Sequence, residues 1–170
     1  TSINKAAVGI TKTASGITLN SPTTGTDTLS NVERLQFSDG AVAFDLNGNA
    51  GKTAKLLGAV FGKESITNKE YVGIGLRELD AGMSYEALAK LAIDARLGAN
   101  ADKASIVTTL YTNVAGTPPS AADLNEFVKL LNNGTFTVAS LTVYAADHQL
   151  NQDHISLVGL SQTGIDYLVV

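Results

Sequence analysis

The hydrophobic pattern of this chain changes its period near residue 49, and this change limits the possible folds more than any other feature. Before this point, apolar residues occur in short β-branched or alternating runs, which are typical of strands. After it, they recur every three or four residues, which is typical of amphipathic helices. The sequence therefore predicts an α+β fold, in which a β-rich segment at residues 1–46 precedes an all-helical domain at residues 47–150.

The β-rich segment is expected to contain short strands and one clear hairpin. The apolar runs lie at residues 7–11, 16–19, 32–37 and 41–44. The segments Lys12-Thr13-Ala14-Ser15 and Pro22-Thr23-Thr24-Gly25 interrupt them as turn or break signals. Ser38-Asp39-Gly40 joins the last two runs, so we expect a β-hairpin there.

The helical part is expected to contain six to seven helices. Six stripes of apolar residues have helical spacing, and a seventh helix is expected after Asn151. Glycine is favoured just past a helix because that position needs a positive φ, and glycines end five of the stripes, at Gly62, Gly82, Gly98, Gly116 and Gly134. Thr67-x-x-Glu70 and Ser120-x-x-Asp123 have the capping-box pattern that starts a helix.

The helical part also repeats itself. Leu56-Leu57-x-x-Val60-x-Gly62 matches Leu110-Tyr111-x-x-Val114-x-Gly116, Leu79-Asp80-Ala81-Gly82 aligns with Leu131-Asn132-Asn133-Gly134, and Leu88 aligns with Leu141. We therefore expect two duplicated three-helix units, at about residues 50–98 and 104–148, stacked around a shared core. Residues 151–170 form a third, C-terminal segment.

Charge and composition exclude several classes of function. The net charge is −4, and residues 111–170 contain a single basic residue, Lys129, against five acidic ones. Such a surface disfavours nucleic acid and anionic membranes as partners. No apolar stretch is long enough to insert into a bilayer, and residues 1–5 show no N-terminal export signal. Cysteine is absent, which suits a chain that enters an oxidising space.

One candidate metal site follows the predicted hairpin. Asp45, Asn47 and Asn49 would supply oxygen ligands at positions 1, 3 and 5 of a calcium loop. In the alternative interpretation, Asn47 and Gly48 form a turn and Asn49 caps the next helix. A phosphate-binding loop is excluded, because Leu46 stands where its first glycine is needed.

A second candidate calcium ligand is Asp27. Gly25, Asp27 and Leu29 fit the end of the calcium β-roll nonapeptide G-G-x-G-x-D-x-U-x, so this part is expected to be a β-roll cap. The two histidines, His148 and His154, are expected on the surface or at helix ends. No nucleophile motif or pair of catalytic acids is visible, so the sequence predicts no enzyme.

The end of the sequence, Asp166-Tyr167-Leu168-Val169-Val170, has one carboxylate followed by four apolar or aromatic residues. Terminal residues are usually frayed and polar. This pattern has two interpretations that do not exclude each other. One interpretation is a last strand docked on the domain, and the other is a segment that another protein binds.

Residues 25–40 resemble the segment that follows the calcium repeats of RTX (repeats-in-toxin) proteins. Residues 45–51 and 110–118 resemble a phycobilisome-linker-like helical domain of secreted bacterial proteins. The resemblance implies a secreted or cell-surface protein that binds calcium and is exported by type I ABC machinery, which recognises an uncleaved C-terminal signal. Asp166 through Val170 is similar to such a signal. The expected function is a non-catalytic export and capping module; the alternative is an extracellular interaction module that binds a surface polymer or self-associates.

Overall fold

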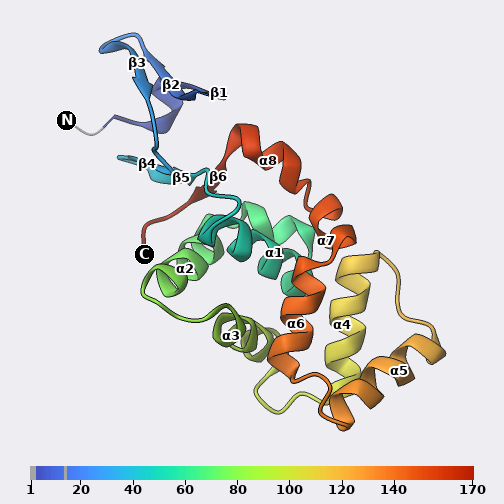
Figure 1. Cartoon of the computed structure of the whole chain (residues 1–170). Coiled ribbons are helices and arrows are strands. Elements are labelled where there is room, and N and C mark those ends of the chain that lie inside the picture. Colours follow the sequence, from blue (N-terminus) through green and yellow to red (C-terminus); the bar gives the residue numbers. More distant parts are fainter. Residues whose placement is uncertain (1–2, 14) are drawn as a thin grey trace.

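The computed structural model describes residues 3–13 and 15–170 (Figure 1). Two expectations touch the remaining residues. The turn expected at residues 12–15 includes Ala14, and the segment expected to lack an export signal includes Thr1 and Ser2. These parts of the predictions lie outside the described residues.

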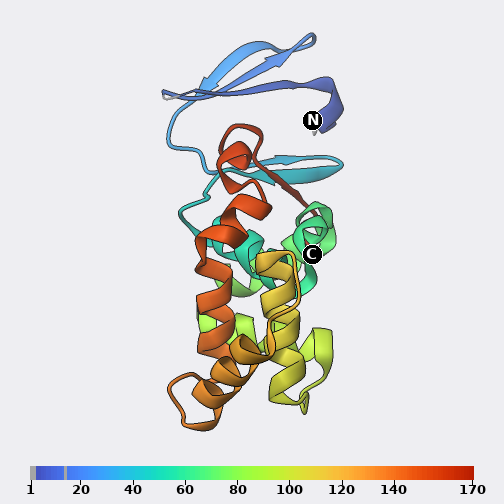
Figure 2. The same cartoon turned by 90° about the vertical axis from the view of Figure 1, so that its right-hand side faces the viewer.

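The N-terminal part forms two small antiparallel sheets. After the short 3-10 helix η1 (Lys5–Ala7), the first sheet has the order β1-β2-β3, with β1 (Gly9–Thr13), β2 (Gly16–Ser21) and β3 (Gly25–Leu29). The predicted hairpin is confirmed as β4 (Arg34–Phe37) and β5 (Gly40–Ala43), whose register pairs Phe37 with Gly40 and Arg34 with Ala43. In Figure 2 the sheets lie one beyond the other above most of the helices, whereas the helical segment Leu157–Thr163 lies at the level of the second sheet.

The second sheet is completed by the end of the chain. Strand β6 (Ile165–Tyr167) pairs antiparallel with β5, so the order is β4-β5-β6. The register places Ala43 opposite Ile165 and Ala41 opposite Tyr167. The hairpin and the last residues of the chain therefore form one structural unit, although the whole helical domain separates them in sequence.

The predicted α+β fold is confirmed, and the described residues contain eight α-helices. Six of them belong to the expected repeats: α1 (Asn49–Phe61), α2 (Lys69–Asp80), α3 (Tyr85–Leu97), α4 (Lys103–Ala115), α5 (Ala121–Asn132) and α6 (Val138–Asp147). The short 3-10 helix η2 (Lys63–Thr67) joins α1 to α2. In place of one helix after Asn151, the chain forms two short ones, α7 (Gln149–His154) and α8 (Leu157–Thr163), because Ser156 adopts a left-handed conformation between them.

The predicted helix ends are confirmed, and one of the predicted starts is not. All five glycines at the ends of the stripes have positive φ. Ser120 caps α5 as predicted, because its hydroxyl accepts the Asp123 amide at 3.1 Å. The predicted cap of α2 was wrong by one residue: the side chain of Asn68, not of Thr67, accepts the first free amides. The Thr67 hydroxyl donates instead to the Glu64 carbonyl at 2.8 Å, within η2.

Three clusters of buried apolar residues hold the molecule together. The largest joins α1 to α6 and includes Val60, Leu88, Leu110 and Leu141. The second joins the sheet β4-β5-β6 to α1, α2 and α7 through Ala43, Leu57, Leu76, Ile155 and Ile165. The third lies between the two sheets and includes Ile17, Phe37 and Val42. The C-terminal segment thus contributes to the core that joins sheet and helices.

Candidate functional site

The C-terminal residues lie along α2 as well as along β5. Asp166 forms ion pairs with Lys5 and, at 3.5 Å, with Lys69. The backbone amide of Leu168 donates to the Lys69 carbonyl at 2.9 Å. The segment predicted as an export signal is therefore tied to the N-terminal part of the described chain and to the start of α2.

Gly73 allows this close approach. A Cβ atom at Gly73 would overlap the carbonyl oxygen of Leu168 and lie 3.1 Å from its carbonyl carbon. Beyond this contact the chain becomes more accessible, since Leu168, Val169 and Val170 are 40%, 63% and 46% exposed. The five residues thus divide into a paired part, Asp166 and Tyr167, and an apolar end that faces solvent.

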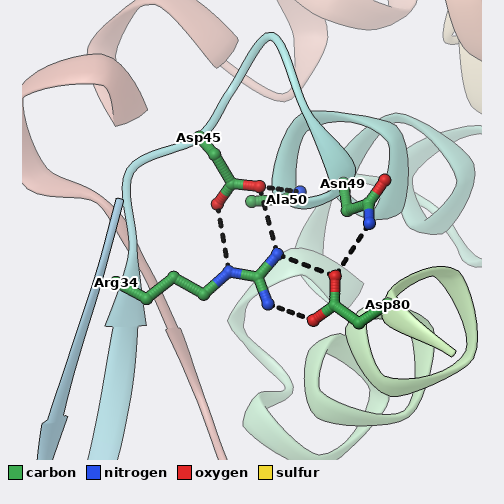
Figure 3. Close-up of polar contacts among 5 residues, drawn as sticks. All are labelled: Arg34, Asp45, Asn49, Ala50 and Asp80. Carbon is green, nitrogen blue, oxygen red and sulfur yellow. Dashed lines mark hydrogen bonds and ion pairs between the residues drawn. The ribbon is translucent and has the colours of Figure 1, made fainter. Parts of the chain in front are cut away.

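Arg34 is the centre of a second cluster, beside the turn that was predicted to bind calcium (Figure 3). Its Nε and Nη2 donate to the two carboxylate oxygens of Asp45, at 3.3 and 3.1 Å. Its Nη2 also donates to Oδ1 of Asp80 at 3.1 Å, and its Nη1 to Oδ2 of the same residue. The guanidinium therefore joins β4, the turn before α1 and the last residue of α2.

Backbone and amide donors complete this cluster. The Ala50 amide donates to Asp45 Oδ2 at 3.2 Å, and the Asn49 side-chain nitrogen donates to Asp80 Oδ1 at 2.7 Å. Asp45 is the more enclosed of the two carboxylates, because its side chain is only 7% exposed and that of Asp80 is 41% exposed. Both carboxylates are thus satisfied within the protein.

The charges in this cluster affect one another. The hydrogen bond from Arg34 is the main cause that holds the pKa of Asp80 below its usual value. The stabilising effect of this pair is present at neutral pH and is lost as the pH falls through the lowered pKa of Asp80. Burial is the main cause that raises the pKa of Tyr167; Arg34 opposes this shift, and Asp80 and Asp45 add to it. Tyr167, the last residue of β6, therefore lies beside the cluster around Arg34.

The four residues predicted as calcium ligands do not come together. Asp45 and Asn49 lie at the Arg34 cluster, whereas Asn47 is exposed in the turn. Asp27 lies exposed on β3, in the other sheet. In the alternative interpretation, the turn at Asn47 is present, but Asn49 is the first residue of α1 and not its cap.

Sequence reasoning missed Arg34, Asp80, Lys69 and Gly73. Arg34 belongs to the stretch that carries the RTX resemblance, but no local pattern connects it to Asp80. The contacts of these residues join segments that are far apart in the chain. Hydrophobic periodicity and turn residues predict local structure only, so they do not predict such pairs.

Two apolar grooves of the helical domain each have a volume of about 200 Å³. One lies between α1, α2 and α3, and the other between α4, α5, α6 and α7. Matching positions of the two predicted repeats line them: Leu56 and Leu110, Leu88 and Leu141, Leu91 and Tyr144, and Ala92 and Ala145. The two grooves are therefore lined by residues that the predicted alignment pairs, and the duplication itself stays a prediction.

The groove formed by α4 to α7 is the more aromatic. Tyr111 and Phe127 pack edge to face with their ring centroids 6.4 Å apart, and Tyr144 is half exposed at the rim. His148 lines the same groove and caps α7, since its Nδ1 accepts the Leu150 amide at 3.3 Å. His148 and His154 are both exposed, as expected.

Within residues 3–13 and 15–170, no three His, Asp or Glu side chains are grouped so that they could hold one metal ion. No helix in this part of the chain has the length and apolar character needed to cross a membrane. Comparisons of the chain with models of protein families, with curated proteins and with solved structures found no match.

Proposed function

We propose that this chain is the non-catalytic export and capping module of a secreted bacterial RTX-type protein, with Asp166–Val170 as an uncleaved type I secretion signal. The observation that carries this proposal is the position of these residues. They add the edge strand to a sheet that is otherwise a hairpin, and their last three residues stay exposed. A segment held in this way is free in the unfolded chain and packed in the folded one.

The proposed mechanism uses this difference. The type I ABC exporter engages the last residues of a chain that is still unfolded. Once these residues have left the cell, they pair with β5 and pack against α2, and the buried side chain of Ile165 joins the core. A ladder between residues this far apart forms only after both segments are free. The same five residues would thus serve first in export and then in capping the fold.

Calcium enters this proposal at Asp27. A cation that binds only the native state stabilises it by an amount that rises with the logarithm of its free concentration above the dissociation constant, so calcium outside the cell would favour folding there. Asp27 lies on β3, an edge strand of the first sheet, and its side chain is exposed.

The export signal can be tested by deletion. We expect a reporter fused ahead of this chain to be exported by a type I system, and deletion of Asp166–Val170 to reduce export to the level of the reporter alone. The reason is that the exporter would lose the segment it recognises. The measurement is the fraction of reporter in the medium.

The control for this experiment is Gly73→Ala, which disturbs the docking of the segment and leaves all five residues in place. Export of this variant should equal that of the parent, because the signal acts before folding. Unchanged export after the deletion would rule out the signal, whereas loss of export in the Gly73 variant would point to a requirement for folding.

A second candidate function is an extracellular interaction module that self-associates or binds a surface polymer. The groove between α4 and α7 favours it, because Tyr144 and Leu150 are half exposed beside an apolar hollow. Large aromatic side chains at the rim of such a groove commonly anchor a partner.

The two grooves provide a matched test of this candidate. Tyr144 and Leu91 occupy equivalent positions and are 50% and 45% exposed. If the aromatic groove binds a partner, Tyr144→Lys should abolish self-association in sedimentation analysis or retention on purified peptidoglycan, and Leu91→Lys should leave both unchanged. A parent chain that is monomeric and not retained would exclude this function.

A further inference from the structure

The turn before α1 has the spacing of a calcium loop, but its ligands are already engaged. Calcium takes six to eight oxygen ligands at about 2.3–2.6 Å, so the oxygens of a calcium loop must converge on one point. Here the carboxylate of Asp45 faces Arg34 and the Ala50 amide, and the side chain of Asn49 presents its nitrogen to Asp80. Figure 3 shows that the carboxylates of Asp45 and Asp80 face the guanidinium, whereas the Ala50 amide and the Asn49 nitrogen each point at one of these carboxylates.

The rest of the loop pattern is also unavailable to an ion. Position 12, which supplies two oxygens in a calcium loop, is Leu56, a core residue that is 2% exposed. Position 6 is Ala50, which is fully buried in the first turn of α1. Asn47 at position 3 is exposed. The residues present therefore do not fit a bound calcium ion.

The charges of this cluster show which group takes the place of a bound cation. Two carboxylates, from Asp45 and Asp80, face one guanidinium. Arginine presents its donors in a rigid planar fork that suits carboxylates, and it keeps its charge at every physiological pH. A divalent cation brought to the same carboxylates would be repelled by the guanidinium at short range.

We infer that the Arg34 guanidinium is the resident cation of the turn at residues 45–50, so that arginine occupies the place in which the sequence pattern predicts calcium. Arg34 joins the hairpin to the start of α1 and the end of α2, as a structural ion would. The junction between sheet and helices therefore forms without calcium. This inference is independent of the export proposal.

The test is thermal unfolding with calcium and with a chelator. The parent and all variants carry Asp27→Asn, so that only the turn is examined. We expect the midpoint of the Arg34 parent to be the same in millimolar calcium chloride and in EDTA. Arg34→Gln should lower the midpoint by about 5–10 °C, because it leaves the enclosed Asp45 carboxylate without a counter-charge. Calcium should recover part of this loss, since the vacated space lies between two carboxylates.

Two further variants complete the experiment. Arg77→Gln is the matched control, because Arg77 is exposed and pairs only with its neighbour Glu78 within the described part of the chain. It should change neither the midpoint nor its response to calcium. Arg34→Lys keeps the positive charge, so its midpoint should stay insensitive to calcium even if the glutamine variant does not fold. A rise of the parent midpoint in calcium that Asp45→Asn removes would overturn the inference.

Discussion

Replacing Gly73 with alanine is expected to lower the free energy of unfolding by about 2–4 kcal/mol, because it forces the C-terminal segment away from α2. The new methyl group would overlap the carbonyl oxygen of Leu168. The atom that it meets belongs to the backbone of Leu168 and not to the end of a flexible side chain that could move aside. The segment must shift, which weakens the bond from Leu168 to Lys69 and the pairing of β6 with β5. Urea denaturation followed by circular dichroism measures this loss.

Gly159→Ala is the matched control. Gly159 is also inside a helix, α8, but no atom outside its own helix and chain neighbours lies within 4 Å of the added Cβ. Alanine is favoured over glycine in a helix, so this variant should gain about 0.5–1 kcal/mol. Opposite signs for the same substitution would establish the close approach at Gly73. If both variants gain stability, the C-terminal segment does not dock as described.

Replacing Gly51 with alanine is expected to cost about 3 kcal/mol or more, which is the range of severe backbone clashes and overpacking. A Cβ at Gly51 would overlap the carbonyl oxygen of Leu46 and lie 2.6 Å from its carbonyl carbon. The turn before α1 would have to move. Asp45 would then lose its contacts with the Ala50 amide and with Arg34.

The same denaturation experiment measures the Gly51 variant, and Gly9→Ala serves as its control. A Cβ at Gly9 would meet only Asn20, at an ordinary distance of 3.7 Å. The free energy of unfolding of the Gly9→Ala variant should therefore differ little from that of the parent. A Gly51 variant as stable as the parent would contradict the observed packing of the turn on α1. The close approach of two backbone segments thus explains the glycine at position 51.

Local signals predicted most of the secondary structure. The hairpin at residues 34–43, the six repeat helices and their glycine ends all depend on residues within one or two turns of each other. The error at Thr67 arose because Asn68 competes for the same amides and lies at the observed helix start. The division after Asn151 into α7 and α8 was missed, since the strained Ser156 gives no sequence signal.

The candidate sites were predicted less completely. The sequence predicted Asp45, Asn47 and Asn49 as calcium ligands, but it did not predict that Arg34 and Asp80 would engage Asp45 and Asn49. It offered a docked strand as one interpretation of the last five residues, without a partner for it. The partners of the turn and of the last five residues are far away from them in the chain. Local propensity carries no information about contacts at that separation.

The sequence by itself therefore determined where strands and helices form, since period, turn residues and caps act over a few residues. Only the tertiary structure decided that β6 completes the hairpin sheet and that a guanidinium lies in the loop with calcium-like spacing. The physical reason is that these choices depend on which surfaces meet when the core closes. Ile165 and Leu76 then share one cluster, and Arg34 comes within reach of two carboxylates.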